Sequence, residues 1–229
     1  MRWATNHVDM LIAPSEHTAA EITPIAGDTP VRVVSSGVDL TRFRSDPEKR
    51  RRFRSTYHLE RPTVISVGQV IPRKGVEDFI AVAQLLPEFD FIWVGPEVSP
   101  FLFYSPRFSR MIKHPPDNLR FLGYISDIEQ VYNGGDAFFF PSHNESLGLV
   151  ILEAAAVGLP IVVRDLPVYR GWLEEGPAVR KGNTPEEFAA ALTELLSVSP
   201  HGAYHDFITQ HSLPRVGEEL VAAYEEVLK

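Results

Sequence analysis

Residues 137–163 read AFFFPSHNESLGLVILEAAAVGLPIVV. A short apolar run comes first, followed by a polar loop, apolar residues at helical spacing and a second apolar run. These parts are Ala137–Phe140, then Leu147, Val150, Ile151, Ala154 and Ala155, and finally Ile161–Val163. Continuously apolar runs of this length predict strands buried on both faces, as in a parallel sheet covered by helices. The stretch therefore predicts a strand, a helix and a parallel strand, the repeating unit of an α/β fold.

The same alternation continues on both sides of this stretch. Further candidate strands are Met10–Ala13, Val31–Val34, Thr63–Val67, Phe89–Val94, Leu119–Leu122 and Ala178–Val179. Helical spacing of apolar residues begins at Val76, and Thr184 and Pro185 suit the N-cap and first position of another helix. We therefore predict a doubly wound parallel sheet with helices on both faces. In such sheets ligands bind beyond the carboxyl ends of the strands.

The composition fits a globular protein and excludes several functions. The chain has 229 residues, with 22 Lys+Arg against 30 Asp+Glu and a net charge of −8. This acidic balance lacks the cationic footprint of a nucleic-acid binder. Without cysteine, the chain has no disulfide framework, cysteine zinc site or catalytic thiol. No apolar run approaches the roughly 18 residues of a membrane span, and the N-terminus lacks a signal-peptide pattern. Together these features favour a cytoplasmic protein.

The loop GQVIPRKG, residues 68–75, follows the predicted strand Thr63–Val67 and leads into a helix. Its terminal glycines permit tight turns and a close approach of the backbone to a ligand. Free N–H groups at the helix start, together with Arg73 and Lys74, favour a bound phosphate or diphosphate. The alternative is a polar strand-to-helix turn without a ligand.

Two carboxylates frame the loop after Phe140. Glu145 lies near the predicted helix start, and Glu153 follows eight residues later, about 12 Å further along a helix axis. Carboxylates accept hydrogen bonds from sugar hydroxyls, and the N–H groups between them suit phosphates. A nucleotide-sugar presents hydroxyls, a diphosphate and hydroxyls in that order. The alternatives are a first-turn acid for Glu145 and an exposed helix residue for Glu153.

These motifs together resemble a known family. In chain order stand Val67-Gly68, Arg73-Lys74-Gly75, the frame ESLGLVILEA of residues 145–154 and GLPIV of residues 158–162. The series resembles the C-terminal, donor-binding domain of retaining family 4 (group 1) glycosyltransferases, which have the two-domain GT-B fold. The resemblance implies that residues 1–36 are the tail of the N-terminal domain and a linker. It implies that residues 37–229 form the nucleotide-sugar-binding domain, with a last helix that crosses back toward the N-terminal domain.

The resemblance also implies a function. It implies a nucleoside-diphosphate sugar donor, UDP-linked and glucose-like, and retaining transfer of the hexose without a metal or a cofactor. Glu145 would contact the transferred sugar as the catalytic residue, Lys74 the diphosphate and Glu153 the ribose. Further donor-binding residues implied by the family are Gly68, Arg73, Asn144, Ser146, Leu147, Gly148 and Leu149. The family usually has arginine where this chain has Gln69, which leaves Arg73 or Arg164 to complete the diphosphate clamp.

The acceptor is less well defined by the sequence. The segment RDLPVY, residues 164–169, resembles the branch of the family that glucosylates diacylglycerol, a membrane lipid. The family's acceptor-binding N-terminal domain is expected to be missing from these 229 residues, so the chain alone should transfer little or no sugar. Two alternatives stay open: a non-catalytic module that binds a nucleotide-sugar, and a GT-B-type epimerase of sugar nucleotides.

Two basic segments have two interpretations each. Residues 37–62 carry Arg42, Arg44, Lys49, Arg50, Arg51, Arg52, Arg54 and Arg61. They form either a solvated helix face or a patch that attracts anions. Residues 101–113 mix aromatic and basic side chains, and either pack into the core or lie on the inner face of an anionic membrane.

Overall fold

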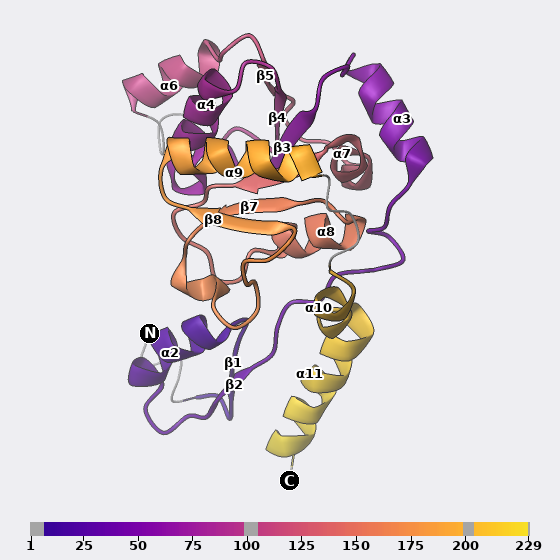
Figure 1. The fold of residues 1–229 in the computed structure, drawn as a ribbon. Helices are drawn as coiled ribbons and strands as arrows, with labels where there is room; N and C mark the ends of the chain where they lie inside the picture. The colour runs from indigo at the N-terminus through magenta and orange to yellow at the C-terminus, as the bar shows by residue number, and fades with distance from the viewer. Residues whose placement is uncertain (1–6, 99–104, 199–203, 229) are drawn as a thin grey trace.

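The computed structural model describes residues 7–98, 105–198 and 204–228 (Figure 1). Six strands form a parallel sheet in the order β5-β4-β3-β6-β7-β8. Their bounds are β3 Thr63–Val67, β4 Asp90–Val94, β5 Leu119–Phe121, β6 Ala137–Phe140, β7 Ile161–Arg164 and β8 Val179–Gly182. The chain runs outward from β3 to β5 and then returns to the other side of β3. The order therefore reverses between β3 and β6, which confirms the predicted doubly wound sheet and sets its switch point.

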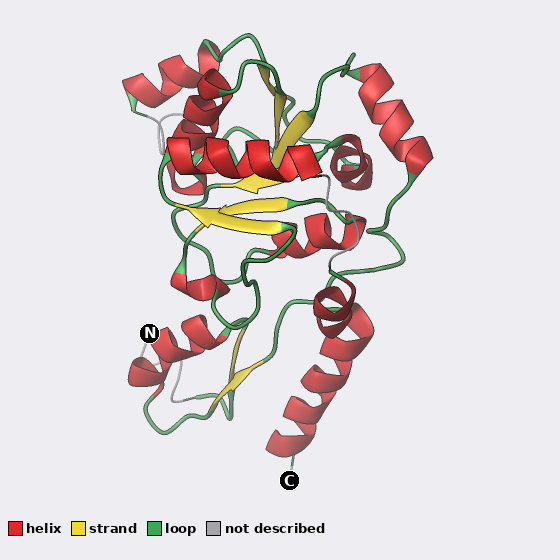
Figure 2. Ribbon diagram, in the orientation of Figure 1, coloured by secondary structure: helices red, strands yellow, loops and turns green. Residues whose placement is uncertain are grey.

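Helices cover both faces of this sheet (Figures 1 and 2). Val64 and Phe139 face one core, shared with α4 (Val76–Leu85), α6 (Pro106–Lys113) and α9 (Pro185–Val198). Phe138 and Phe140 face the opposite core, which contains side chains of four other helices. Those helices are α3 Pro47–Thr56, α7 Ile128–Gly134, α8 Leu149–Val157 and α10 His205–Gln210. The alternation within β6 explains its uninterrupted run of apolar residues, since both of its faces are buried.

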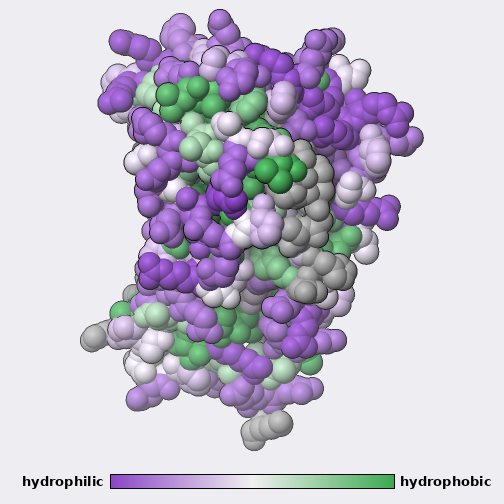
Figure 3. All heavy atoms as spheres, in the orientation of Figure 1, coloured by the Kyte–Doolittle hydropathy of each residue, from purple (hydrophilic) through white to green (hydrophobic). Residues whose placement is uncertain are grey.

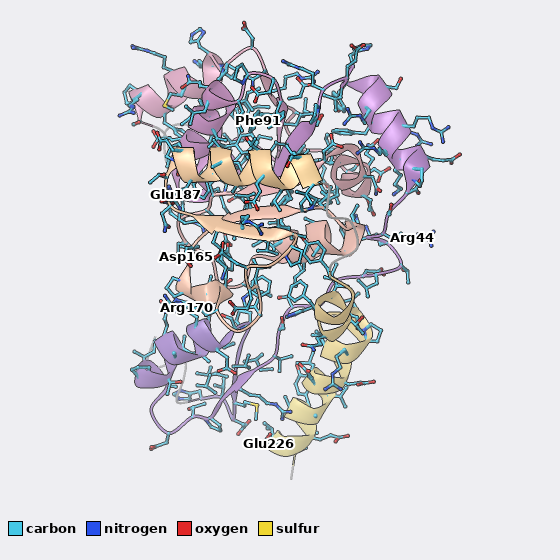
Figure 4. The ribbon with its side chains drawn as sticks, in the orientation of Figure 1. Arg44, Phe91, Asp165, Arg170, Glu187 and Glu226 are labelled. Carbon is cyan, nitrogen blue, oxygen red and sulfur yellow. The ribbon has the colours of Figure 1, made fainter. Side chains whose placement is uncertain are left out.

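Most of the basic stretch at residues 37–62 forms ion pairs within the protein. Arg50 and Arg54 of α3 both contact Asp136, at 2.6 and 3.0 Å. Lys49 pairs with Asp127 at 3.1 Å, and Arg42 with Glu129. These contacts tie α3 to α7 and the segment around it, so much of the stretch is structural. The remaining exposed cations include Arg44 (labelled in Figure 4), Arg51 and Arg52.

The described part of the aromatic and basic segment packs into the core. Phe108 and Ile112 of α6 are buried, whereas Arg107, Arg110 and Lys113 are exposed. The apolar face of α6 is thus occupied by the protein itself. Residues 101–104 of the segment lie outside the described residues. Among the described helices, none is both long enough and apolar enough to cross a bilayer.

The first two predicted strands form, but in a sheet of their own. β1 (Leu11–Ala13) and β2 (Val31–Val33) pair in parallel and are joined by α2 (Glu16–Ala26). The last helix, α11 (Leu213–Val227), runs beside them (Figure 1). Arg32 contacts Glu226, which is labelled in Figure 4, at 2.7 Å. A cavity of about 340 Å³ lies between β1 and α11, lined by residues that include Val8, Ile12, Tyr224 and Val227. The face of the molecule seen in Figure 3 is largely hydrophilic. The division at residue 36 stays a prediction.

Candidate functional site

The two predicted loops meet at the switch point, beyond the carboxyl ends of β3 and β6. Gly75, which follows the 3₁₀ turn η1 (Pro72–Lys74), has a φ of +77°. A Cβ at this position would lie 2.2 Å from the carbonyl oxygen of Pro141. The His143 N–H also donates to the carbonyl of Arg73 at 2.9 Å. Only glycine permits this approach, so the loops after β3 and β6 form one surface.

Lys74 and Glu145 form an ion pair at the centre of this surface. The Lys74 Nζ lies 2.5 Å from Glu145 Oε1, and the two side chains are 16% and 9% exposed. The buried Ser142 hydroxyl donates to the same carboxylate oxygen at 2.6 Å. Lys74 Nζ also lies 5.1 Å from the centre of the Phe140 ring, and Gly68 lies beside the Lys74 stem. The site thus holds a cation and a carboxylate that neutralise each other in a poorly hydrated position.

Glu145 is not an acid of the first helical turn, because α8 begins only at Leu149. The cause is Gly148, whose φ of +96° places it outside the helical region. A Cβ there would lie 2.9 Å from Ile151 Cδ1. The estimate of 12 Å between the two glutamates therefore does not apply, since Glu145 lies in the loop.

Glu153 lies in the second turn of α8 and faces the core of the protein. The fully buried Tyr132 hydroxyl donates to Glu153 Oε2 at 2.5 Å. Burial raises the pKa of Glu153, while the Tyr132 hydrogen bond and the Arg42 charge act in the opposite direction. The interpretation of Glu153 as an exposed helix residue is therefore wrong. Its carboxylate is held in place by Tyr132, and its second oxygen, Oε1, has no hydrogen-bond donor among the described residues.

The raised pKa of Glu153 predicts how the affinity for a nucleotide-sugar depends on pH. If Glu153 accepts a ribose hydroxyl, affinity for UDP-glucose should fall as the pH is lowered through this pKa, which exceeds the usual 4.5. The loss should begin at a higher pH than an ordinary glutamate would give. Glu153→Gln cannot titrate and should flatten the profile in calorimetry at a series of pH values. A wild-type profile as flat as that of Glu153→Gln would contradict this role.

The loop between Glu145 and α8 offers a run of unoccupied backbone donors. Within the described part of the chain, the N–H groups of residues 145–149 have no hydrogen-bond acceptor. Arg73 Nη1 donates to the carbonyl of Asn144 at 2.7 Å, which links the loop to η1. Ser146 and Leu149 are exposed, whereas Leu147 is buried and anchors the loop. The structure therefore brings all ten sequence-predicted site residues to α8, its leading loop and the neighbouring loop after β3.

The Arg164 guanidinium is occupied by contacts within the protein. It contacts Asp78 Oδ2 at 2.5 Å and donates to the carbonyls of Pro141 and Asn183 at 3.2 and 3.0 Å. All three nitrogens are thus engaged by other groups of the protein, and the side chain is largely buried. Arg73 is the exposed alternative.

Sequence reasoning missed Ser142, Asp78 and Tyr132, which support the predicted residues. No pattern marks Ser142, whereas Asp78 was visible only as an acid in the first turn of α4. Tyr132 reaches Glu153 from another helix across 21 residues of chain. Among residues 7–98, 105–198 and 204–228, no group of three His, Asp or Glu side chains is placed to hold a metal ion.

Several characterised proteins are similar to this chain in sequence. The processive diacylglycerol alpha-glucosyltransferase of Acholeplasma laidlawii is 33% identical over 231 residues, spanning 96% of this chain and 68% of that protein. The alpha-galactosylglucosyldiacylglycerol synthase of Streptococcus pneumoniae is 37% identical over 138 residues, spanning 57% of this chain and 35% of that protein. The chain thus spans only part of the length of these relatives.

Solved structures share the fold at low sequence identity. HepE of Anabaena, solved in complex with UDP and glucose, has a TM-score of 0.86 at 19% identity, over 97% of this chain and 64% of that one. Sucrose-phosphate synthase of Thermosynechococcus elongatus has a TM-score of 0.85 at 18% identity, over 99% of this chain and 60% of that one. The neighbours are GT-B glycosyltransferases, which confirms the predicted fold. The family model "Glycosyl transferases group 1" matches residues 47–210, and with this match the chain belongs to that family.

Proposed function

We propose that the loops after β3 and β6, at the switch point of the sheet, bind a nucleoside-diphosphate sugar, UDP-linked and glucose-like, for retaining transfer of the hexose to a lipid acceptor. The observation that carries the proposal is the Lys74–Glu145 pair at the switch point, 2.5 Å between Nζ and Oε1. Two relatives named for diacylglycerol glycolipids support the lipid acceptor, and a fold neighbour solved with UDP and glucose supports the donor.

The proposed roles follow from the contacts in the site. A diphosphate beside Lys74 competes with Glu145 for the ammonium, and the free N–H groups of residues 145–149 supply further donors to its oxygens. Glu153 accepts the ribose hydroxyls, and Glu145, once released from Lys74, contacts the hexose. The Lys74 ammonium and these N–H groups stabilise the negative charge that develops on the departing diphosphate in the transition state. We propose that no metal ion takes part in this step.

The acceptor site belongs to a different part of the protein in this proposal. The chain spans 68% of the Acholeplasma laidlawii relative, and we propose that acceptor contacts come from the portion that it does not span. The sheet β1–β2 would then be the tail of that acceptor domain, with α11 packed against it. Under this proposal the 229-residue chain binds donor but transfers little sugar.

A lipid acceptor requires the enzyme to work at a membrane surface. The exposed cations Arg107, Arg110 and Lys113 of α6 suit peripheral binding to anionic lipids at the inner face of the membrane. This part of the proposal rests on charge alone, because the apolar face of α6 is packed in the core.

One assay tests the reaction, its stereochemistry and the membrane contact. The 229-residue chain, alone and extended by an N-terminal domain, is incubated with UDP-glucose and vesicles containing diacylglycerol, with and without anionic lipid. We expect an α-linked glycolipid by NMR from the extended protein, more of it on anionic vesicles, and little from the chain alone. Donor binding without product would favour a binding module, and a changed sugar still linked to UDP would favour an epimerase. A β-linked product would overturn retention.

A further inference from the structure

The N-terminus of α2 contacts the loop between β6 and α8, residues 141–148, which we call the donor loop. The Ser15 hydroxyl donates to the carbonyl of Ser146 at 2.8 Å, and the Thr18 hydroxyl donates to the same carbonyl at 3.1 Å. These residues are separated from Ser146 by 131 and 128 positions in the sequence. Ser15 is only 5% exposed, so its hydrogen bond to the loop is protected from water.

This contact is more than a helix cap. Ser15 caps α2 as an acceptor, because its Oγ receives the Thr18 N–H at 3.2 Å. Capping needs only the oxygen, so the Ser15 proton remains for the acceptors within reach, the Ser146 carbonyl at 2.8 Å and the Thr18 hydroxyl at 3.0 Å. The Thr18 hydroxyl takes no part in accepting this N–H and points to the same carbonyl. The two hydroxyls therefore serve the loop in addition to the helix.

Two carbonyls of the donor loop are thus held by two different segments of the chain. Arg73 holds the carbonyl of Asn144 at 2.7 Å, and Ser15 and Thr18 hold that of Ser146. The N–H groups of residues 145–149, which begin between these two carbonyls, have no acceptor within the described residues. Fixing the carbonyls restricts rotation of the peptide groups, which keeps the N–H groups aligned for an anion before it arrives.

We infer that Ser15 and Thr18 are positioning residues of the donor site: by holding the Ser146 carbonyl, they keep the backbone donors of the loop ready for the diphosphate. The inference rests on the proposed function. It makes donor affinity depend on α2, a segment outside the six-stranded sheet. Both residues act through a hydroxyl group that donates a hydrogen bond to the Ser146 carbonyl. A side chain that cannot donate a hydrogen bond should therefore lose this effect.

The test separates donation from helix capping. Ser15→Asp keeps a capping oxygen but cannot donate when ionised, and Thr18→Val removes the hydroxyl while keeping the shape of the side chain. Ser15→Thr keeps both functions. Thr23→Val is the matched control, because Thr23 donates to Ala19 within α2 at 2.7 Å. Hydrogen exchange of amides 145–149 is measured without ligand, and UDP-glucose affinity is measured by calorimetry.

We expect Thr18→Val and Ser15→Asp/Thr18→Val to speed exchange at amides 145–149, and the double variant to bind UDP-glucose about tenfold more weakly. Ser15→Thr and Thr23→Val should match the wild type in both measurements. Unchanged exchange and affinity in the double variant would overturn the inference, and so would an equal loss in Thr23→Val. A wild-type chain that does not bind UDP-glucose would refute the proposed function instead, while the exchange rates would still decide whether the contact orders the loop.

Discussion

Lys74→Ala is expected to weaken UDP-glucose binding about 10- to 150-fold, because a charge-assisted hydrogen bond contributes about 1.5–3 kcal/mol. The same change leaves the Glu145 carboxylate, 9% exposed, without its cation. An uncompensated charge in such a position should lower the free energy of unfolding by about 3 kcal/mol. Calorimetry measures the first effect and urea unfolding the second.

A second variant separates these two effects. Lys74→Ala/Glu145→Gln removes both charges of the pair, so its stability should recover most of the loss while UDP-glucose binding stays weak. Lys74→Arg keeps the charge and should lose less affinity than Lys74→Ala. If Lys74→Ala binds UDP-glucose as tightly as the wild type, Lys74 has no role at the diphosphate.

Gly75→Ala is expected to be the most destabilising single-methyl change at the site. Its φ of +77° costs alanine about 1–2 kcal/mol. The added Cβ would lie 2.2 Å from the Pro141 carbonyl oxygen, so the loops after β3 and β6 must separate, at a further cost of about 1–3 kcal/mol. We therefore expect a total loss of about 2–5 kcal/mol in urea unfolding, with weaker donor binding because Lys74 moves with its loop.

Gly176→Ala is the matched control for this variant. A Cβ at Gly176 meets no heavy atom within 4 Å, and its φ lies outside the left-handed region. The control should stay within about 0.5 kcal/mol of the wild type, as surface substitutions usually do. Equal stability of the two variants would show that the close contact between the loops is not a constraint on the fold.

The sheet and the placement of the candidate-site residues on it could be predicted because both depend on local patterns. The apolar runs Thr63–Val67 and Ala137–Phe140 agree with β3 and β6 at both ends. Strands buried on both faces leave this continuous signal, which does not depend on knowing their neighbours. The loops that follow them contain Lys74 and Glu145, and strand order then brought these residues together.

The side-chain contacts around the site and the start of α8 could not be predicted, because they depend on distant segments and on backbone conformation. Nothing near Arg164 in the sequence indicates that Asp78 and two carbonyls occupy its guanidinium. The basic residues of α3 looked like a solvated face or an anion patch, but Asp136 pairs with two of them. The later start of α8 depends on the backbone conformation of Gly148, which composition does not reveal. Single-sequence patterns contain no information on such pairings.

An NMR titration tests directly whether a nucleotide-sugar binds at the switch point of the sheet. UDP-glucose is added to the isotope-labelled 229-residue chain while backbone amide shifts are followed. We expect saturable shifts concentrated at residues 68–75 and 144–153, absent in Lys74→Ala at the same UDP-glucose concentration. Shifts concentrated instead around the exposed arginines of α3, or no saturable shift at all, would contradict binding at the switch point.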